Sequence, residues 1–374
     1  MEDREYWYWL CSTEGLGPIT LRRLLALYRD PRVLWQETNL PIPTRIADAL
    51  HQAKSNITSL REELDSLEKR GIFWCHFREE TYPARLRELP DAPCALYWRG
   101  RLPDERPCAG IVGSRTCSPY GRSMAERFAG ELAGAGVQII SGMAAGIDSH
   151  AQRAALHCGG SSHAVLGCGV DICYPPSNYD LYERLIHEGS IISEYRPGTK
   201  PLAGHFPPRN RIISGLSDVL LVMEAREKSG TSITVDRALE YGKDVFALPG
   251  RLSDSLSIGC NRLIAQGAGI LTCTEDVLRA LPTASPDTAV SLQRPDNNTE
   301  ASSKAGQRVP ARPDTARLSP AASRVLSHIG HEAVHLDALL THSGLQARDV
   351  YLVLDELESA GFIRPVSTSY YARI

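Results

Sequence analysis

The chain has 374 residues, 43% of them apolar and 23% charged, which is ordinary for a globular protein of two or three domains. Its formal net charge of −3 excludes a molecule-wide cationic field, so any nucleic-acid site has to be a local patch. The first five residues lack the basic and apolar segments of a signal peptide, and no apolar run is long enough to span a membrane. We therefore expect a cytoplasmic protein with no membrane partner.

The ten cysteines are scattered along the chain and form no Cys-x-x-Cys pair. Cys168 and Cys173 lie closest together, and nothing near them completes a zinc ligand set. We expect reduced, packing cysteines and no metal site.

The first hundred residues predict an N-terminal helical domain, residues 1–100. Apolar positions recur at helical spacing over Tyr6–Leu10, Ile19–Tyr28 and Ile57–Lys69. Gly15-Leu-Gly-Pro18 resembles the hairpin of a SAM or helix-hairpin-helix-like unit, whose glycines let backbone N–H groups approach a phosphate. Many such hairpins only join two helices, so both interpretations stay open.

From residue 101 to 281 the pattern becomes strand, loop and helix in repetition. Continuous apolar strands separated by helices predict a doubly wound, parallel α/β sheet of the Rossmann-like kind. Ligands of such sheets bind beyond the carboxyl ends of the strands, so the loops there are the candidate site. The expected strands are Ala109–Val112, Val137–Ile140, His163–Leu166, Ile191–Ser193, Val219–Met223, Val245–Leu248 and Ile270–Thr272.

The loop after the first of these strands carries Ser114 and Arg115, a hydroxyl and a five-donor guanidinium suited to a phosphate. It is not Gly-x-Gly-x-x-Gly, and the chain has no Walker A sequence. Neither dinucleotide binding nor ATP hydrolysis is indicated, and we expect no cofactor.

Two further loops bring glycines and hydroxyls to the same edge of the sheet. Gly142 and Gly146 allow close backbone approach, and Asp148 is positioned either as a helix N-cap, the commoner role, or as a general base. The third loop opens a helix with a run of N–H and hydroxyl donors. That run is Ser229, Gly230, Thr231 and Ser232.

The segment from Glu194 to Met223 is central to this interpretation. Up to Arg211 it holds four Lys or Arg residues against one acid, and it is expected to be a loop before an apolar helical turn and a buried strand. Cations beside an aromatic ring suit a nucleic-acid strand, because cations neutralise phosphates and a ring stacks on a base. The alternative is a core ring with surface ion pairs. The candidate residues are Lys200, Phe206, Arg209, Asn210 and Arg211.

After residue 281 the composition changes. Residues 282–317 carry five prolines among polar residues and predict a flexible linker. Residues 318–374 then predict three helices and a two-stranded hairpin, the pattern of a winged helix. The third helix, Ala347–Ser359, is acidic, which argues against reading of duplex DNA and favours contact with protein.

Taken together, the motifs resemble the DNA-processing protein A (DprA/Smf) family. The resemblance covers about 110–281 and rests on several blocks that keep their order. They include Ile-Val-Gly-Ser-Arg115, Ser-Gly142-Met-Ala-Ala-Gly146-Ile-Asp148, Phe206-Pro-Pro-Arg-Asn-Arg-Ile-Ile-Ser-Gly215, Ser229-Gly-Thr231 and Ala-Leu-Pro249-Gly250.

This resemblance implies a single-stranded DNA-binding protein that helps to load the RecA recombinase during natural transformation, without catalysis. It implies that Arg115 holds phosphate, that Phe206 stacks on a base, and that Arg209 and Arg211 clamp or brace the loop. It also implies a homodimer formed through the end of the core, with contacts from Ile258, Asn261, Leu263, Ile264 and Ile270.

The chain departs from the family pattern in places, and one alternative remains. Ala203 stands where family members often carry a lysine, for which Lys200 is the nearest substitute, and His150 is displaced. A nucleotide-processing enzyme of the lysine-decarboxylase-like phosphoribohydrolase group would share this kind of core. That group needs a catalytic Glu where this chain has Thr234, and a hydroxyl cannot supply the acid–base chemistry.

Overall fold

The computed structural model describes residues 1–227, 229–282, 318–330, 334–345, 347–360, 362–367 and 370–373. It forms two compact units, Met1–Leu292 and Gln293–Ile374. All but the first residue of the predicted linker lies outside the described residues. Within the described ranges, no helix has the length and apolar character needed to cross a membrane.

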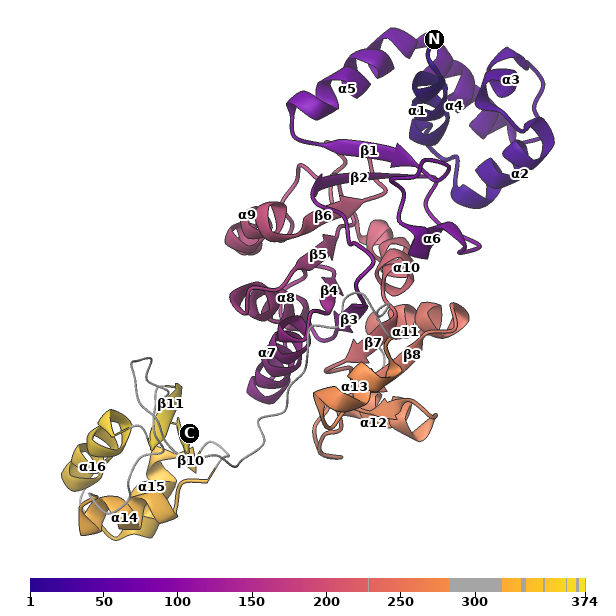
Figure 1. Cartoon of the computed structure of the whole chain (residues 1–374). Coiled ribbons are helices and arrows are strands. Elements are labelled where there is room, and N and C mark those ends of the chain that lie inside the picture. The colour runs from indigo at the N-terminus through magenta and orange to yellow at the C-terminus, as the bar shows by residue number, and fades with distance from the viewer. Residues whose placement is uncertain are drawn as a thin grey trace, which may run out of the picture. The chain divides into compact units, whose positions relative to one another are not determined.

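Five helices open the first unit (Figure 1). Three of them are the helices that the sequence pattern predicts, and two more lie between the second and third of these. Pro18 begins the second helix, where its fixed φ is favourable and its missing N–H costs nothing. Trp7, Trp9 and Leu10 of the first helix are buried among the other helices and the first strands of the sheet. The five helices are α1 (Asp3–Ser12), α2 (Pro18–Tyr28), α3 (Pro31–Gln36), α4 (Thr44–Ser55) and α5 (Ile57–Lys69).

A nine-stranded sheet organises the rest of this unit, in the order β1-β2-β6-β5-β4-β3-β7-β8-β9. The seven strands β3 to β9 are parallel to one another. At one edge, β2 pairs antiparallel with β6, and β1 pairs antiparallel with β2. The predicted doubly wound parallel sheet is therefore confirmed. The strands are β1 (Phe73–His76), β2 (Ala95–Gly100), β3 (Cys108–Val112), β4 (Gln138–Ser141), β5 (Ser162–Val165), β6 (Ser190–Ser193), β7 (Val219–Val222), β8 (Asp244–Ala247) and β9 (Gly269–Ile270).

The sheet extends into the range 1–100 that the sequence assigns to the helical domain. β1 pairs with β2, and β2 pairs with β6 of the core. A short helix, α6 (Ala84–Arg87), lies between β1 and β2 in the chain and contacts α10 (Phe206–Leu216). The helical segment and the sheet are thus joined by two strands in one compact unit.

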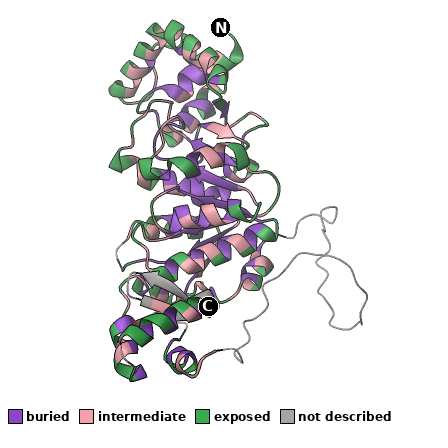
Figure 2. Cartoon of the chain, turned by 90° about the vertical axis from the view of Figure 1, so that its left-hand side faces the viewer, coloured by how far each residue is buried: buried purple, intermediate pink, exposed green. Residues whose placement is uncertain are grey.

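Helices cover both faces of the sheet, and Figure 2 shows the buried strands between their exposed outer surfaces. Ala109 and Ile111 of β3 pack with α7 (Pro119–Gly134) and α8 (Ile147–His157). Val112 points to the other face, where it packs with α10 and α11 (Thr231–Glu240). This alternation along β3 follows from the two-residue repeat of a strand. The remaining helices are η1 (Pro176–Asn178), α9 (Tyr179–Glu188), η2 (Ala203–His205), α12 (Ile258–Ala265) and α13 (Thr274–Ala280).

The helix α10 begins earlier than the sequence suggests. It starts at Phe206, so Arg209, Asn210 and Arg211 are helical and not part of a loop. Pro207 and Pro208 follow Phe206 directly, and two adjacent prolines usually indicate a loop. The first turn of a helix nevertheless accepts proline, because the backbone N–H groups there have no intrahelical partner. The cationic segment is therefore held rigidly.

The second unit is a winged helix, as predicted. The Ser319 hydroxyl accepts from the backbone N–H of Ala322 and caps its first helix. Leu339, Val350 and Leu357 are among its buried core residues. Its elements are α14 (Pro320–Ser327), β10 (Val334–His335), α15 (Leu336–Ser343), α16 (Ala347–Ser359), β11 (Ile363–Ser367) and β12 (Tyr370–Arg373), with β12 central in the small sheet.

Candidate functional site

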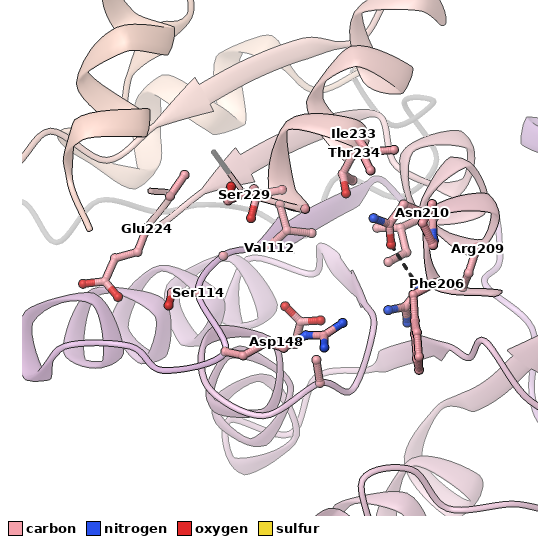
Figure 3. Close-up of a pocket in the computed structure, with 18 of the residues that line it drawn as sticks. Val112, Ser114, Asp148, Phe206, Arg209, Asn210, Glu224, Ser229, Ile233 and Thr234 are labelled. Atoms are coloured by element: carbon pink, nitrogen blue, oxygen red, sulfur yellow. Dashed lines mark hydrogen bonds between the residues drawn. The ribbon is translucent and has the colours of Figure 1, made fainter. Parts of the chain in front are cut away.

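A cavity of about 640 Å³ lies at the carboxyl ends of the central strands, and we name it the switch-point cavity. At β3 the strand order reverses, with β4 on one side and β7 on the other, and this is where open α/β sheets bind ligands. The loops after β3 and β7 and the helices α10 and α11 supply its walls (Figure 3). Residues that line it include Ser114, Arg115, Asp148, Tyr174, Phe206, Arg209, Asn210, Glu224, Ser229, Gly230 and Thr231.

Phe206 stands at the centre of the cationic part of this cavity. Its side chain is partly exposed, and the guanidinium carbons of Arg115 and Arg209 lie 5.4 Å and 5.8 Å from its ring centroid. Cation–π attraction stabilises such pairs by about 0.5–1 kcal/mol at exposed sites. Arg115 and Phe206, which are 91 positions apart in the sequence, thus meet in one cavity, as predicted.

The two arginines play different parts. Arg115 is exposed and has no carboxylate within ion-pair distance among the described residues. Arg209 is buried, and its Nη1 donates to the carbonyl oxygens of Gly142, at 2.8 Å, and Val165. Arg209 therefore ties the ends of β4 and β5 to α10, while the guanidinium of Arg115 is available to a ligand.

Gly142 and Gly146 serve this packing. A Cβ at position 142 would lie 2.4 Å from Arg209 Nη1, and one at 146 would lie 2.3 Å from the Ser114 carbonyl oxygen. Gly146 also has a φ of +79°, which other residues rarely adopt. Both glycines bring structural groups together, and neither is among the cavity-lining residues.

The prediction that Asp148 is an N-cap is wrong. Gly146 occupies the N-cap of α8, and the buried Asp148 carboxylate instead accepts from the Gly142 N–H at 3.1 Å. Burial raises the pKa of Asp148, and the nearby Arg209 guanidinium opposes that rise. Because arginine stays protonated in proteins, we assign an ionised Asp148 that balances the buried Arg209.

Arg211 braces the helix and lies outside the switch-point cavity. It is buried, and its Nη2 pairs with Glu194 at the end of β6. Lys200 is exposed on the loop that leads to the cavity, and the next residue, Pro201, is one of the lining residues. Of the five candidates from this segment, the structure brings Phe206, Arg209 and Asn210 into the cavity.

The polar run that opens α11 divides in a similar way. Ser229, Gly230 and Thr231 line the cavity. The hydroxyl of Ser232 donates to the Ser229 carbonyl oxygen at 2.7 Å and so closes the first turn of the helix. Asn210 accepts from Arg209 Nε at 3.1 Å, an arrangement that points its amide oxygen at the arginine.

Glu224 is a cavity residue that the sequence analysis did not select. Its buried carboxylate accepts from the backbone N–H of Ser118 at 3.0 Å and from the Ser118 hydroxyl. A Cβ at position 121 would lie 2.2 Å from its carboxyl carbon. Burial raises the pKa of Glu224, while its bonds to Ser118 lower it. It anchors the start of α7 beside the cavity. In the sequence it stands just after a buried strand and begins one of the blocks that resemble the family.

The Gly15–Pro18 hairpin joins α1 to α2 and does not line the switch-point cavity. It borders a separate cavity of about 1060 Å³. Arg196 and Arg211 in that second cavity are each paired with a glutamate, so its cations are already neutralised.

The predicted dimer residues differ in accessibility. Ile258 of α12 and Ile270 of the edge strand β9 are exposed, whereas Leu263 and Ile264 are partly buried against the core. Asn261 is engaged within the chain, since its amide exchanges two hydrogen bonds with the Gly250 backbone. Among the described residues, no group of three or more His, Cys, Asp or Glu side chains is placed to hold a metal ion.

The strand order, the cavity at the switch point and the second unit define an extended Rossmann-like α/β protein that carries a winged helix. The family model of DNA recombination-mediator protein A matches residues 74–282, and a model of the DprA winged helix domain matches residues 309–367. The chain belongs to the DNA recombination-mediator protein A (DprA/Smf) family, which confirms the resemblance drawn from its motifs. Its family places it in DNA processing during recombination.

Relatives resemble the chain over its whole length. Protein Smf of Synechocystis is 32% identical over all of both chains, and Protein Smf of Escherichia coli is 34% identical over 99% of this chain and 96% of its own. The X-ray structure of DprA from Streptococcus pneumoniae has a TM-score of 0.65 and 35% identity, covering 75% of this chain and 98% of its own. A Helicobacter pylori DprA structure, described for its single-stranded DNA binding mode, has a TM-score of 0.50 and 32% identity, covering 55% and 94%.

Proposed function

We propose that this protein binds single-stranded DNA in the switch-point cavity and acts as a non-catalytic recombination mediator. The observation that carries the proposal is the partly exposed Phe206 ring with the guanidinium carbons of Arg115 and Arg209 lying 5.4 Å and 5.8 Å from its centroid. A ring offers a stacking surface to any base, and a cation beside it offers charge to the adjoining phosphate. The description of the Helicobacter pylori relative as a single-stranded DNA binder supports the same assignment.

Each lining group has a part in this proposal. Arg115 binds phosphate with its free guanidinium, Phe206 stacks on a base, and Arg209 holds the wall on which Phe206 stands. The N–H and hydroxyl groups of the turn before α11 donate to a neighbouring phosphate. These donors are Ser229, Gly230 and Thr231. Ser114 also lines the cavity, where its hydroxyl donates to the Thr116 carbonyl oxygen at 3.0 Å and would have to turn to reach a phosphate. Lys200 adds charge at the approach.

The partners follow from the family resemblance. We propose that the bound strand is passed to the RecA recombinase, that this occurs in the cytoplasm during natural transformation, and that the protein works as a homodimer. Leu252, Ile258 and Ile270 are exposed apolar residues near the end of the core, and we propose that they take part in the contact with a second copy.

The absence of catalysis is supported by position 234. Thr234 lies in the switch-point cavity and is buried, where the phosphoribohydrolase group needs a carboxylate. The two carboxylates present, Asp148 and Glu224, are engaged with the Gly142 N–H and with Ser118. Nucleoside monophosphate incubated with the protein should therefore be recovered intact, and its hydrolysis would favour the enzymatic alternative.

Recombinase loading tests the proposal as a whole. An oligonucleotide covered with a single-strand-binding protein should acquire a RecA filament faster when the wild-type protein is added. Arg115→Ala should remove that acceleration, whereas Arg122→Ala, which changes an exposed arginine paired with Glu126 on α7, should keep it. No acceleration by the wild-type protein would contradict the mediator role.

A further inference from the structure

Tyr174 is an aromatic residue of the switch-point cavity that the proposal above does not use. It lies in the segment between β5 and α9, and its ring centroid is 5.6 Å from that of Phe206, with 34° between the ring planes. Its side chain is 39% exposed, so the ring is not part of the core. A second accessible aromatic surface therefore adjoins the first.

The segment that carries Tyr174 is tied down on both sides of it. The Asn178 amide donates to the Met143 carbonyl oxygen at 3.0 Å, and the Gly169 N–H donates to the Thr199 carbonyl oxygen at 2.9 Å. Asn178 is buried, so the first of these bonds is shielded from water. The ring is thus presented at the cavity by a fixed backbone, which lowers the entropic cost of using it for binding.

The hydroxyl of Tyr174 makes no hydrogen bond to the described residues. Buried tyrosines of this chain are satisfied: Tyr82 donates to the Pro93 carbonyl oxygen at 2.8 Å, and Tyr182 donates to the Val170 carbonyl oxygen at 2.6 Å. A tyrosine that only fills space beside Phe206 gains nothing from a free hydroxyl at a cavity wall. Exposure and an open hydroxyl both suit contact with a ligand.

The ring geometry decides how bases would use the pair. One base between two rings needs about 7 Å between them, twice the ~3.5 Å of a close carbon contact. The centroids of Tyr174 and Phe206 are only 5.6 Å apart, so a base cannot enter between the rings. The ring planes are inclined by 34°, so the pair is suited to contact with two separate bases and not with one base held between the rings.

We infer that Tyr174 and Phe206 together form a two-base platform, on which Tyr174 stacks with the base next to the one held by Phe206. This inference rests on the proposed single-strand binding and extends it to a second nucleotide of the same strand. Stacking tolerates every base, because each has a π face, so the platform adds affinity and footprint without sequence preference. The Tyr174 hydroxyl, which makes no hydrogen bond to the described residues, would then be available to donate to the strand.

Photocrosslinking and affinity measured together on the full chain test the platform. Oligo-dT with a single 5-iodouracil is irradiated in complex with the protein, and the labelled peptides are mapped for each position of the iodouracil. Because oligo-dT has no fixed register on the protein, the platform predicts that the iodouracil labels both Phe206 and Tyr174. Tyr174→Ala should weaken oligo-dT binding about tenfold, within the range found for removal of a stacked ring.

Three further variants separate stacking from packing. Tyr174→Phe keeps the ring and should stay within about threefold of the wild type. Tyr174→Leu keeps apolar contact with Phe206 but offers no π face, and it should lose nearly as much affinity as Tyr174→Ala. Tyr179→Ala is the matched control, because Tyr179 is 59% exposed, lies five residues further on and does not line the cavity. Its affinity should be unchanged.

The outcomes distinguish this inference from the function beneath it. If Phe206 is labelled but Tyr174 never is, or if Tyr174→Leu binds like the wild type, the platform is wrong and single-strand binding stands. If neither residue is labelled and the wild-type protein does not bind oligo-dT, the proposed function itself fails.

Discussion

The guanidinium carbon of Arg115 lies 5.4 Å from the ring centroid of Phe206, although the two residues are separated by 91 positions in the chain. Arg115 comes from the loop after β3, and Phe206 begins α10. The switch point brings them together, because the parallel strands direct their following loops to one edge of the sheet. This pair is where charge and a stacking surface coincide, and the predictions start from it.

Arg115→Ala should weaken binding of single-stranded DNA to a similar extent for every sequence. The guanidinium has no protein carboxylate as partner among the described residues, so its loss should remove one phosphate contact. The slope of log K against log salt should become shallower by about 0.7, the value for one phosphate of a single strand. A slope equal to that of the wild-type protein would exclude Arg115 from the site.

Phe206→Ala should cost about 1–3 kcal/mol of binding free energy if the ring stacks on a base. The melting temperature should change little, because the ring is partly exposed at the cavity. Phe73→Ala is the control, since Phe73 is an exposed phenylalanine on the edge strand β1, outside the cavity. A fall in melting temperature with unchanged affinity would show that Phe206 serves packing alone.

Arg209→Ala should act on stability first. It removes the donor to the Gly142 and Val165 carbonyl oxygens and leaves the Asp148 carboxylate buried without its balancing charge. Breaking such a buried charged arrangement costs on the order of 3 kcal/mol of unfolding free energy. Urea unfolding of the variant should show this loss together with weak binding. Weak binding with full stability would instead assign Arg209 a direct contact with DNA.

His163 predicts part of the acid sensitivity of the first unit. Burial lowers the pKa of His163 to about 3, against about 6.5 in the unfolded chain, and its ring bonds with Ser190 and Gln138. Between these pKa values the unfolded state binds the extra proton, so stability falls as the pH falls from about 6.5 towards 3. The slope contributed is at most about 1.4 kcal/mol per pH unit.

Unfolding free energies measured between pH 7 and pH 4 check the contribution of His163. The His163→Gln variant should show a shallower loss of stability with acid than the wild-type protein, whatever its stability at pH 7. Buried carboxyls such as Glu224, whose pKa is raised, make the folded state more stable as the pH falls. The effect of His163 is therefore read from the difference in slope between the variant and the wild-type protein. Equal slopes would mean that folding does not lower the pKa of His163.

The sequence predicts the sheet well because continuous apolar runs reveal buried parallel strands. Each of the seven expected core strands is present, and its observed ends lie within one or two residues of the predicted ends. The winged helix and the meeting of Arg115, Phe206 and Arg209 are also as expected. The winged helix follows from helical periodicity in the local sequence, and the meeting of the three residues follows from the rule that loops after parallel strands gather at one edge of the sheet.

What the sequence misses depends on contacts between distant residues. Local patterns do not reveal that Arg209 reaches Gly142, 67 positions away, or that Glu224 holds Ser118, 106 positions away. Asp148 looks like a cap because caps are common at that position, yet a backbone N–H across the turn binds it instead. Tyr174 has no sequence signal of its own, since its importance comes from the ring beside it.

The central claim is that the switch-point cavity binds an unpaired strand. A titration of fluorescent oligo-dT, and of the matching duplex, against the wild-type protein at two salt concentrations tests it most directly. We predict tighter binding of the single strand at both concentrations, because only unpaired bases can stack on Phe206, and weaker binding of both at higher salt. Equal or tighter binding of the duplex would contradict the account.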